Sequence, residues 1–144
     1  MTPEALFSLA SSAVLPGWLL LVFLPRWKWT TRLVTGVLLP GLLGLLYVYL
    51  IATRWVGSEG GFSSLADVKR LFDEPALLLA GWVHYLAFDL FVGTWEVRDA
   101  QKLALPHLLV VPCLVLTFLF GPIGLLLYFG MRGLLRKRLL LEDV

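Results

Sequence analysis

The sequence has very little cysteine and very little charge. Its 144 residues contain one cysteine, Cys113, which excludes an intrachain disulfide and any metal site built from several cysteines. Only 15% of the residues are charged, against about a quarter in soluble domains, and the net charge of +2 gives no indication of nucleic-acid binding. No close pair such as HxxxH or ExxH occurs, so we expect neither a metal nor another cofactor.

What the chain does contain is long apolar runs. Hydrophobic residues make up 59% of the chain, and the mean hydropathy is +0.85. A helix needs about 20 residues to cross a hydrocarbon layer of about 30 Å. Four runs meet this requirement, the last being long enough to be tilted or broken: about 5–24, 33–53, 75–95 and 103–131. We therefore predict an all-α polytopic membrane protein, with four transmembrane helices in a single domain that covers residues 1–144.

The longest connector, between the second and third runs, predicts a short helix. Ser64 and Asp67 fit a capping box, and the apolar residues around them fall roughly on one helical face. We expect an amphipathic interfacial helix over about 63–73. It would serve either as a plain connector on the membrane surface or as a lid over the mouth of the bundle.

The orientation is only weakly indicated. Four spans would place both termini on the same side, and Lys and Arg number seven on that side and five on the other. This excess favours cytoplasmic termini slightly, and the basic cluster 136–138 supports the same choice. The first run lacks a positively charged start and a cleavage site, so we expect a retained helix rather than a signal peptide.

The third run carries His84 and Asp89 near its centre, with Glu96 and Asp99 closer to the interface. Ionisable groups at membrane depth cost on the order of several kcal/mol unless they are paired or solvated, which makes them candidates for a function. Histidine is the natural acid and base near neutral pH, and a carboxyl group in an apolar surrounding can act as a proton donor. The alternative is that Asp89 hydrogen-bonds a neighbouring helix as structural glue.

The two central groups do not form a simple dyad on one helix face. At 100° per residue, His84 and Asp89 lie about 140° apart around the axis and about 7.5 Å apart along it. Either the helix is distorted or each group meets a partner from another helix. For the histidine, such partners would be Tyr47, Tyr49 or Thr117.

The sequence around these residues resembles a known family. Residues 82–93, followed by Asp99, resemble the signature of the abscisic-acid-deficient-four-like family. The similarity covers nearly the whole chain, because it extends to Leu15-Pro16-Gly17-Trp18, Pro25-Arg26-Trp27 and Phe120-Gly121-Pro122-Ile123-Gly124. The family comprises small membrane proteins of plants, algae and bacteria, and its plant members are required for neoxanthin synthesis.

The resemblance implies a role in xanthophyll metabolism, namely conversion of a violaxanthin-type 5,6-epoxide into an allenic end group. Carried over, His84 and Asp89 would be the acid and base candidates, with Asp99 as a third. The aromatic residues expected to bind a polyene are Trp82, Tyr85, Phe88, Phe91 and Trp95. The chain has no transit-peptide extension, so we expect a bacterial-type member in the inner membrane.

Three hypotheses follow for the function. The first is an isomerase of a carotenoid or related isoprenoid lipid, with that ligand and the bilayer as its partners. The second is a non-enzymatic protein that holds a lipid, a pigment or a partner helix. The third is a proton or ion pathway built by oligomerisation, which the sequence disfavours because the other runs carry no charged residue at their centres. A homo-oligomer stays open.

Overall fold

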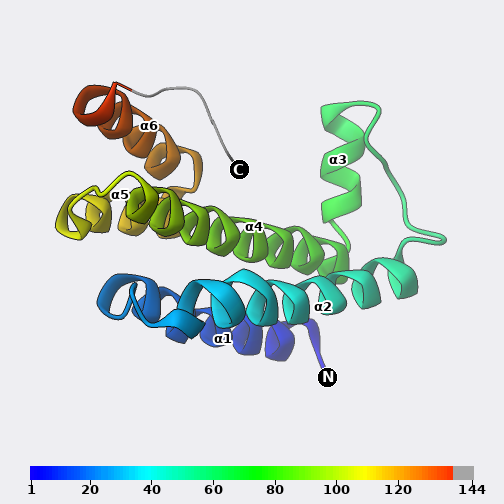
Figure 1. The fold of residues 1–144 in the computed structure, drawn as a ribbon. Coiled ribbons are helices and arrows are strands. Elements are labelled where there is room, and N and C mark those ends of the chain that lie inside the picture. The colour runs from blue at the N-terminus through cyan, green and yellow to red at the C-terminus, as the bar shows by residue number, and fades with distance from the viewer. Residues whose placement is uncertain (138–144) are drawn as a thin grey trace.

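The computed structural model describes residues 1–137, and every regular element in this range is helical (Figure 1). The elements are α1 (Pro3–Phe23), the π-helix η1 (Thr30–Leu38), α2 (Leu39–Arg54), α3 (Leu65–Phe72), α4 (Pro75–Lys102), α5 (His107–Phe120) and α6 (Pro122–Arg136). Three helices are long and apolar enough to cross a membrane: α1, the continuous helix formed by η1 and α2, and α4. The first three predicted spans are therefore confirmed as membrane-length helices.

The π-helical stretch η1 is followed closely by a proline, Pro40. In this stretch the backbone N–H of Leu39 bonds the carbonyl of Val34, five residues earlier. Pro40 would bond the carbonyl of Thr35 in the same register but has no N–H to donate. The Thr94 hydroxyl of α4 lies 3.3 Å from that carbonyl oxygen and 2.8 Å from the carbonyl oxygen of Leu90, so its single proton serves one of the two at a time. The proline therefore leaves an acceptor that ties η1 to α4.

α4 is the central helix, and α1, α2 and α5 pack around it. Its apolar side chains Val83 and Leu90 are fully buried between these neighbours. Gly93 permits the closest approach to α1, because a Cβ atom at this position would lie 2.7 Å from a ring carbon of Trp18. Close packing of this kind stabilises helix contacts in membranes, where water provides no hydrophobic drive between helices.

The predicted short helix is confirmed as α3. The Ser64 hydroxyl accepts a hydrogen bond from the backbone N–H of Asp67 and donates to its carboxylate, which is the predicted capping interaction. On the other side of the helix, the ring of Phe72 packs over Gly81 of α4. α3 therefore stands against the start of α4, as Figure 1 shows.

The predicted fourth span is not a single helix. Gly121 breaks it with a φ of +48°, a conformation that residues with a side chain rarely adopt, and Pro122 then begins α6. α5 and α6 contain 14 and 15 residues, so each is only about 21–23 Å long. They pack against each other as a helical hairpin, and α6 leads back toward the end of α4 from which α5 started (Figure 1).

The hairpin changes where the described chain ends. Phe7 of α1 contacts Trp82 in the first half of α4, with ring centroids 5.4 Å apart. At the other end of α4, Arg136 of α6 donates a hydrogen bond to the carbonyl oxygen of Ala104. Within residues 1–137, the start of α1 and the end of α6 therefore lie at opposite ends of α4, so the predicted fourth crossing, and with it the placement of both termini on one side, is not confirmed. Arg138 of the predicted basic cluster lies outside the described residues.

Candidate functional site

Asp89 lies close to the midpoint of α4, at the tip of the α5–α6 hairpin. A Cβ atom on Gly121 would lie 2.8 Å from its Oδ1 and 3.2 Å from its Oδ2, so the carboxylate packs directly on the backbone of the hairpin tip. The Oδ2 atom is buried and has no hydrogen-bond partner among the described residues. Buried polar atoms without a partner are rare in folded proteins, and each calls for an explanation such as a bound ligand.

Toward the C-terminal end of α4, the hairpin covers a second carboxylate. Glu96 is fully buried, and the Thr117 hydroxyl of α5 lies 3.0 and 3.2 Å from its two oxygens. This hydroxyl has one proton to donate, so it serves one of the two oxygens at a time. A Cβ atom on Gly124 of α6 would lie 2.2 Å from the same hydroxyl oxygen. Glu96 is therefore sealed where α5 and α6 meet.

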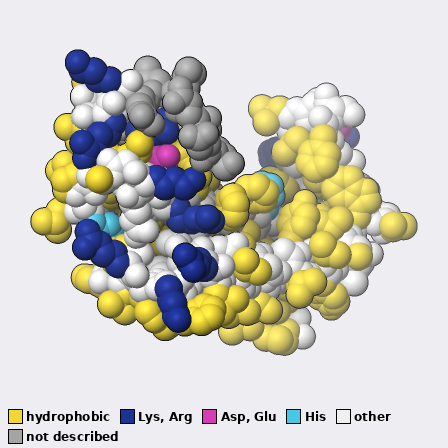
Figure 2. All heavy atoms as spheres, in the orientation of Figure 1, with side chains coloured by type: hydrophobic (Ala, Val, Ile, Leu, Met, Phe, Trp, Pro, Cys, Tyr) yellow, Lys and Arg dark blue, Asp and Glu magenta, His cyan; other side chains and the backbone are white. Residues whose placement is uncertain are grey.

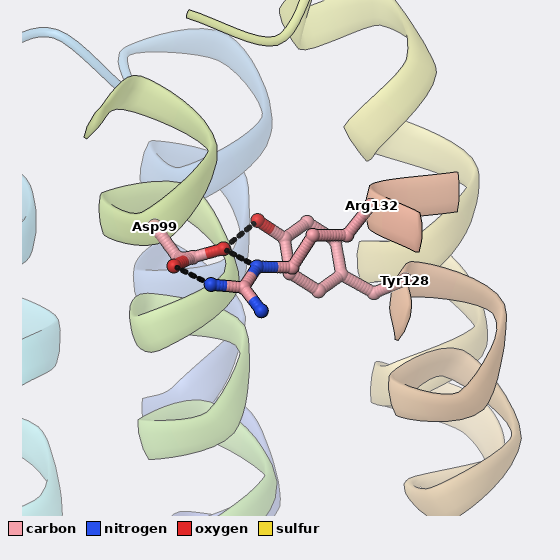
Figure 3. Close-up of polar contacts among 3 residues, drawn as sticks. All are labelled: Asp99, Tyr128 and Arg132. Carbon is pink, nitrogen blue, oxygen red and sulfur yellow. Dashed lines mark hydrogen bonds and ion pairs between the residues drawn. The ribbon is translucent and has the colours of Figure 1, made fainter. Parts of the chain in front are cut away.

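Asp99 forms the centre of a polar cluster that joins α4 to α6 (Figure 3). Its Oδ2 accepts hydrogen bonds from the Tyr128 hydroxyl (2.6 Å) and from Nε of Arg132 (2.9 Å). Its Oδ1 accepts from Nη2 of Arg132 (3.3 Å). The side chains of the ion pair are only 3% and 12% exposed for Arg132 and Asp99. Because both carboxylate oxygens are engaged, the surroundings of Asp99 are those of a structural anchor.

Toward the N-terminal end of α4, the hairpin does not cover the helix face that carries Asp89. We call this part the open half of α4. Trp82 and Tyr85 precede Asp89 and fall within about 40° of it around the axis. The Trp82 ring lies between Phe7 of α1 (5.4 Å) and Tyr85 (5.3 Å), and its Nε1 donates to the Ser11 hydroxyl (3.0 Å). A pocket of about 400 Å³ opens beside Trp82, between the starts of α1 and α4. Aromatic side chains thus lead along α4 toward the carboxylate.

His84 lies in a different place from Asp89. It is exposed, its ring stacks on Phe88 at 4.5 Å, and it faces Tyr47 of α2 at 6.0 Å, one of the partners that the sequence suggested. It lines a pocket of about 280 Å³ among α2, α3 and α4, whose walls include Phe72. The helix is regular here, so the separation of about 140° between the two groups is preserved. The structure therefore gives each its own surroundings.

The predicted polyene-binding aromatics are divided in the same way. Trp82 and Tyr85 lie on the Asp89 side, whereas Phe88 stacks on His84. Phe91 is 53% exposed on the outer surface of α4. Trp95 packs beneath α6, where its ring lies 5.4 and 5.7 Å from two aromatic rings of that helix. Only two of the five predicted residues therefore adjoin the open half of the Asp89 face.

The hairpin residues that hold the carboxylates were not predicted from the sequence. Thr117 was suggested as a partner for His84 but serves Glu96, and neither Tyr128 nor Arg132 was singled out. A signal was present, because Tyr128 and Arg132 are four residues apart and therefore lie on one helix face. An arginine in such an apolar run needs an anion, and Asp99 is the anion that it meets.

Among residues 1–137, no three His, Cys, Asp or Glu side chains gather closely enough to hold a metal ion. The remaining ligand types take part in packing. Nε2 of His107 lies 2.9 Å from the carbonyl oxygen of Val22, which joins α5 to α1. Cys113 is buried, and its thiol donates to the carbonyl of Leu109 at 3.8 Å.

A model of protein families described as ABA DEFICIENT 4-like matches residues 5–128. The chain belongs to the ABA DEFICIENT 4-like family. It is 25% identical over 145 residues to the protein ABA DEFICIENT 4, chloroplastic, of Arabidopsis thaliana. This alignment covers 94% of the chain and 64% of the relative, so the chain spans less than two thirds of the relative's length. No solved structure matches the chain.

The family match confirms the resemblance seen in the sequence. It runs from the start of α1 into α6 and so includes Asp89, Glu96, Asp99 and Tyr128. Arg132 lies beyond the matched residues. The ABA DEFICIENT 4-like part of the chain thus contains the open carboxylate and most of the hairpin that borders it.

Proposed function

We propose that this ABA DEFICIENT 4-like protein is a membrane isomerase that binds a carotenoid-like isoprenoid along the open half of α4 and transfers protons at Asp89. The buried Oδ2 of Asp89 carries this proposal, because it has no hydrogen-bond partner among the described residues. Glu96 and Asp99, on the same helix, are both engaged by the hairpin. Asp89 has the Tyr85 hydroxyl as a hydrogen-bonding neighbour but keeps one oxygen, Oδ2, without a partner among the described residues, so it is the carboxylate with capacity left for a ligand.

The shape of the open half suits a long apolar ligand with a polar end group. The aromatic series Phe7, Trp82 and Tyr85 runs beside the pocket of about 400 Å³ and ends one helical turn before Asp89. Flat aromatic faces pack well against a polyene or an isoprenoid chain. A ligand lying here would place its end group at the carboxylate, near the middle of a membrane-length helix, and its chain toward the start of α4.

The hairpin tip gives the end group a defined position. Gly121 lies directly against the Asp89 carboxylate, so the hairpin closes the site on the side of Glu96. The Tyr85 hydroxyl donates to the carbonyl oxygen of Phe118 at 3.3 Å, which fixes one wall of the open half to α5. A carboxyl group that is held rigidly and screened from water can deliver its proton to one atom of a bound ligand.

The reaction suggested by the plant members needs only such proton transfers. The protonated carboxyl group gives its proton to the epoxide oxygen as the ring C–O bond breaks. The electron pair of that bond moves to the oxygen, and loss of a proton from the neighbouring carbon forms the new double bond. The Asp89 carboxylate, now deprotonated, can accept that second proton, which returns the enzyme to its initial state. No oxidant or reductant is needed, because the product is an isomer.

In this proposal, His84 takes no part in the chemistry at Asp89. It cannot contact the same end group, since it lies in the pocket among α2, α3 and α4. We propose that it is not part of the proton transfer at Asp89. Of the two acid and base candidates from the sequence, the geometry favours the carboxylate.

The test is a pigment and lipid comparison in the native host. We would extract a deletion strain complemented with wild type, Asp89→Asn or the exposed control Asp73→Asn, and compare the extracts by liquid chromatography and mass spectrometry. A compound that accumulates on deletion should be consumed by wild type and by the control and persist with Asp89→Asn. Violaxanthin would be supplied in a second experiment as the substrate suggested by the plant members.

Two outcomes would contradict the enzyme proposal. Full activity of Asp89→Asn would remove the carboxylate from the chemistry. Unchanged pigments and lipids in the deletion strain, with the same isoprenoid copurifying with wild type and Asp89→Asn, would instead support a protein that binds its ligand without converting it.

A further inference from the structure

The charged side chains are distributed unequally between the two ends of the molecule. Figure 2 shows dark blue side chains gathered over the end where α4 finishes and yellow side chains over most of the rest. Among residues 1–137, this basic end carries seven exposed Lys and Arg: Arg26, Lys28, Arg32, Arg98, Lys102, Arg136 and Lys137. The carboxylates here, Glu96 and Asp99, are covered by the hairpin. The opposite end has three Lys or Arg and five Asp or Glu.

The hairpin increases this asymmetry, because it brings Arg136 and Lys137 at the end of α6 to the basic end. Lys and Arg next to membrane spans are enriched on the cytoplasmic side and attract anionic lipids. Trp27 and Trp29 are exposed in the same connector, and Nζ of Lys28 lies 5.2 Å above the Trp29 ring. Tryptophan and lysine in this arrangement are typical of the head-group level of a membrane. The basic end is therefore expected to face the anionic leaflet.

Within this end, the connector after α1 and the connector between α4 and α5 meet around a pocket of about 500 Å³. Nε2 of Gln101 donates to the carbonyl of Pro25 (2.7 Å), which holds the connector after α1 against the end of α4. His107 is tied to α1 through the carbonyl of Val22 (2.9 Å). Arg26 lines the same pocket, as do Gln101 and His107. These contacts make the pocket part of the folded structure rather than a gap between loose loops.

The chemistry of the pocket fits an anion with several oxygens. The Arg26 guanidinium presents paired donors to phosphate oxygens. α5 begins at His107, which lines the pocket, and the residue before it is Pro106, which has no side-chain group to cap the helix. The first N–H groups of α5 therefore add to the positive potential at this point. An apolar pocket between α1 and α5 includes Val22, whose carbonyl oxygen contacts His107, and acyl chains would pack there.

We propose that this pocket binds the phosphate of an anionic phospholipid from the leaflet at the basic end. The bound head group would join the connector after α1 to the start of α5 and so steady the base of the hairpin. The proposal is independent of any reaction at Asp89, which lies at the other end of the hairpin.

The test uses the full chain purified in detergent, with phosphatidylglycerol and phosphatidylcholine as probes. Native mass spectrometry counts retained lipid, and thermal unfolding measures stabilisation. Phosphatidylglycerol should bind wild type and raise its Tm more than phosphatidylcholine does. Arg26→Gln should weaken phosphatidylglycerol binding about tenfold, the factor expected for a lost charge-assisted contact. Arg26→Lys should give an intermediate loss, because the ammonium group keeps the charge but not the paired donors.

Two matched variants distinguish a pocket from diffuse attraction. Arg54→Gln removes an exposed arginine at the opposite end, and Lys28→Gln removes an exposed cation from the same connector that does not line the pocket. Both variants should retain most of the phosphatidylglycerol binding and of the rise in Tm. The proposal would be overturned if wild type bound both lipids equally, or if Lys28→Gln lost as much phosphatidylglycerol binding as Arg26→Gln. Equal stabilisation by inorganic phosphate alone would indicate a soluble anion and would also overturn a lipid site.

Discussion

Asp89 and Asp99 lie on the same helix and have opposite surroundings. Asp99 receives three hydrogen bonds from Tyr128 and Arg132, and the ion pair is almost completely buried. Asp89 packs on the glycine at the hairpin tip, and one of its oxygens has no partner among the described residues. The two halves of one helix face thus differ in what covers them. A carboxylate is structural where the fold supplies donors to both of its oxygens, and it is a candidate for chemistry where one oxygen is left without a donor.

The largest effect is expected at the engaged carboxylate. Arg132→Met leaves Asp99 buried without its charge partner, and losing one member of a buried pair costs about 3–5 kcal/mol. Thermal unfolding in detergent should show a lower Tm and early aggregation. Arg98→Met, which removes an exposed arginine at the same end of α4, is the control and should unfold like wild type. Equal stability of the two variants would mean that the ion pair does not hold the hairpin.

The hairpin tip should be the next most sensitive position. Gly121→Ala forces a side chain onto a φ of +48° and places its Cβ 2.8 Å from the Asp89 carboxylate. Strain of this kind costs about 1–3 kcal/mol. Gly130→Ala is the matched variant, since nothing lies within 4 Å of its added Cβ, and it should be neutral or slightly stabilising. Indistinguishable Tm values would argue against contact between the tip and Asp89.

A smaller loss is expected where α5 donates to Glu96. Thr117→Val removes the hydroxyl that lies 3.0 Å from a carboxylate oxygen, and a buried acceptor left without a donor costs about 1–3 kcal/mol. Thr117→Ser keeps the hydroxyl and should recover most of the stability. Chemical denaturation followed by tryptophan fluorescence compares the variants. If serine is no better than valine, packing of the threonine methyl group, and not the hydrogen bond, explains the loss.

The smallest effect is expected at His84. Its ring is exposed, so His84→Ala should change the free energy of unfolding by only about 0.5 kcal/mol. Because His84 and Asp89 have separate surroundings, ligand conversion should also persist in this variant. Measuring the product by liquid chromatography shows whether His84→Ala still converts the ligand. Loss of conversion with unchanged stability would show that the two residues act at one site.

The sequence predicted the long helices because their evidence is local. Runs of about 20 apolar residues predict spans, and the Ser64–Asp67 pair predicts the start of α3. The break in the fourth run was harder to place, although Gly121 and Pro122 mark it. Whether such a break kinks a span or reverses it depends on long-range contacts, here those of Arg132 with Asp99 and of Arg136 with Ala104.

Only part of the candidate site was predicted, because only part of the evidence for it is local in the sequence. Helical spacing separated His84 from Asp89 around the axis of α4, and the two residues have different neighbours in the structure. It could not assign partners, because these come from other helices: Tyr47 for His84, and the hairpin for the carboxylates. Glu96 was expected near the interface, but the hairpin buries it fully. Spacing along one helix gives the direction of a side chain, whereas burial depends on what the rest of the chain places there.

The most direct measurement compares Asp89→Asn with Asp99→Asn in the same preparation, with both Tm and ligand conversion recorded. The account predicts that Asp89→Asn unfolds at or above the Tm of wild type and loses conversion. It predicts that Asp99→Asn unfolds at a clearly lower Tm, because Arg132 loses its anion. The opposite pattern, in which Asp89→Asn is the less stable variant and retains conversion, would contradict the account and make Asp89 a structural residue.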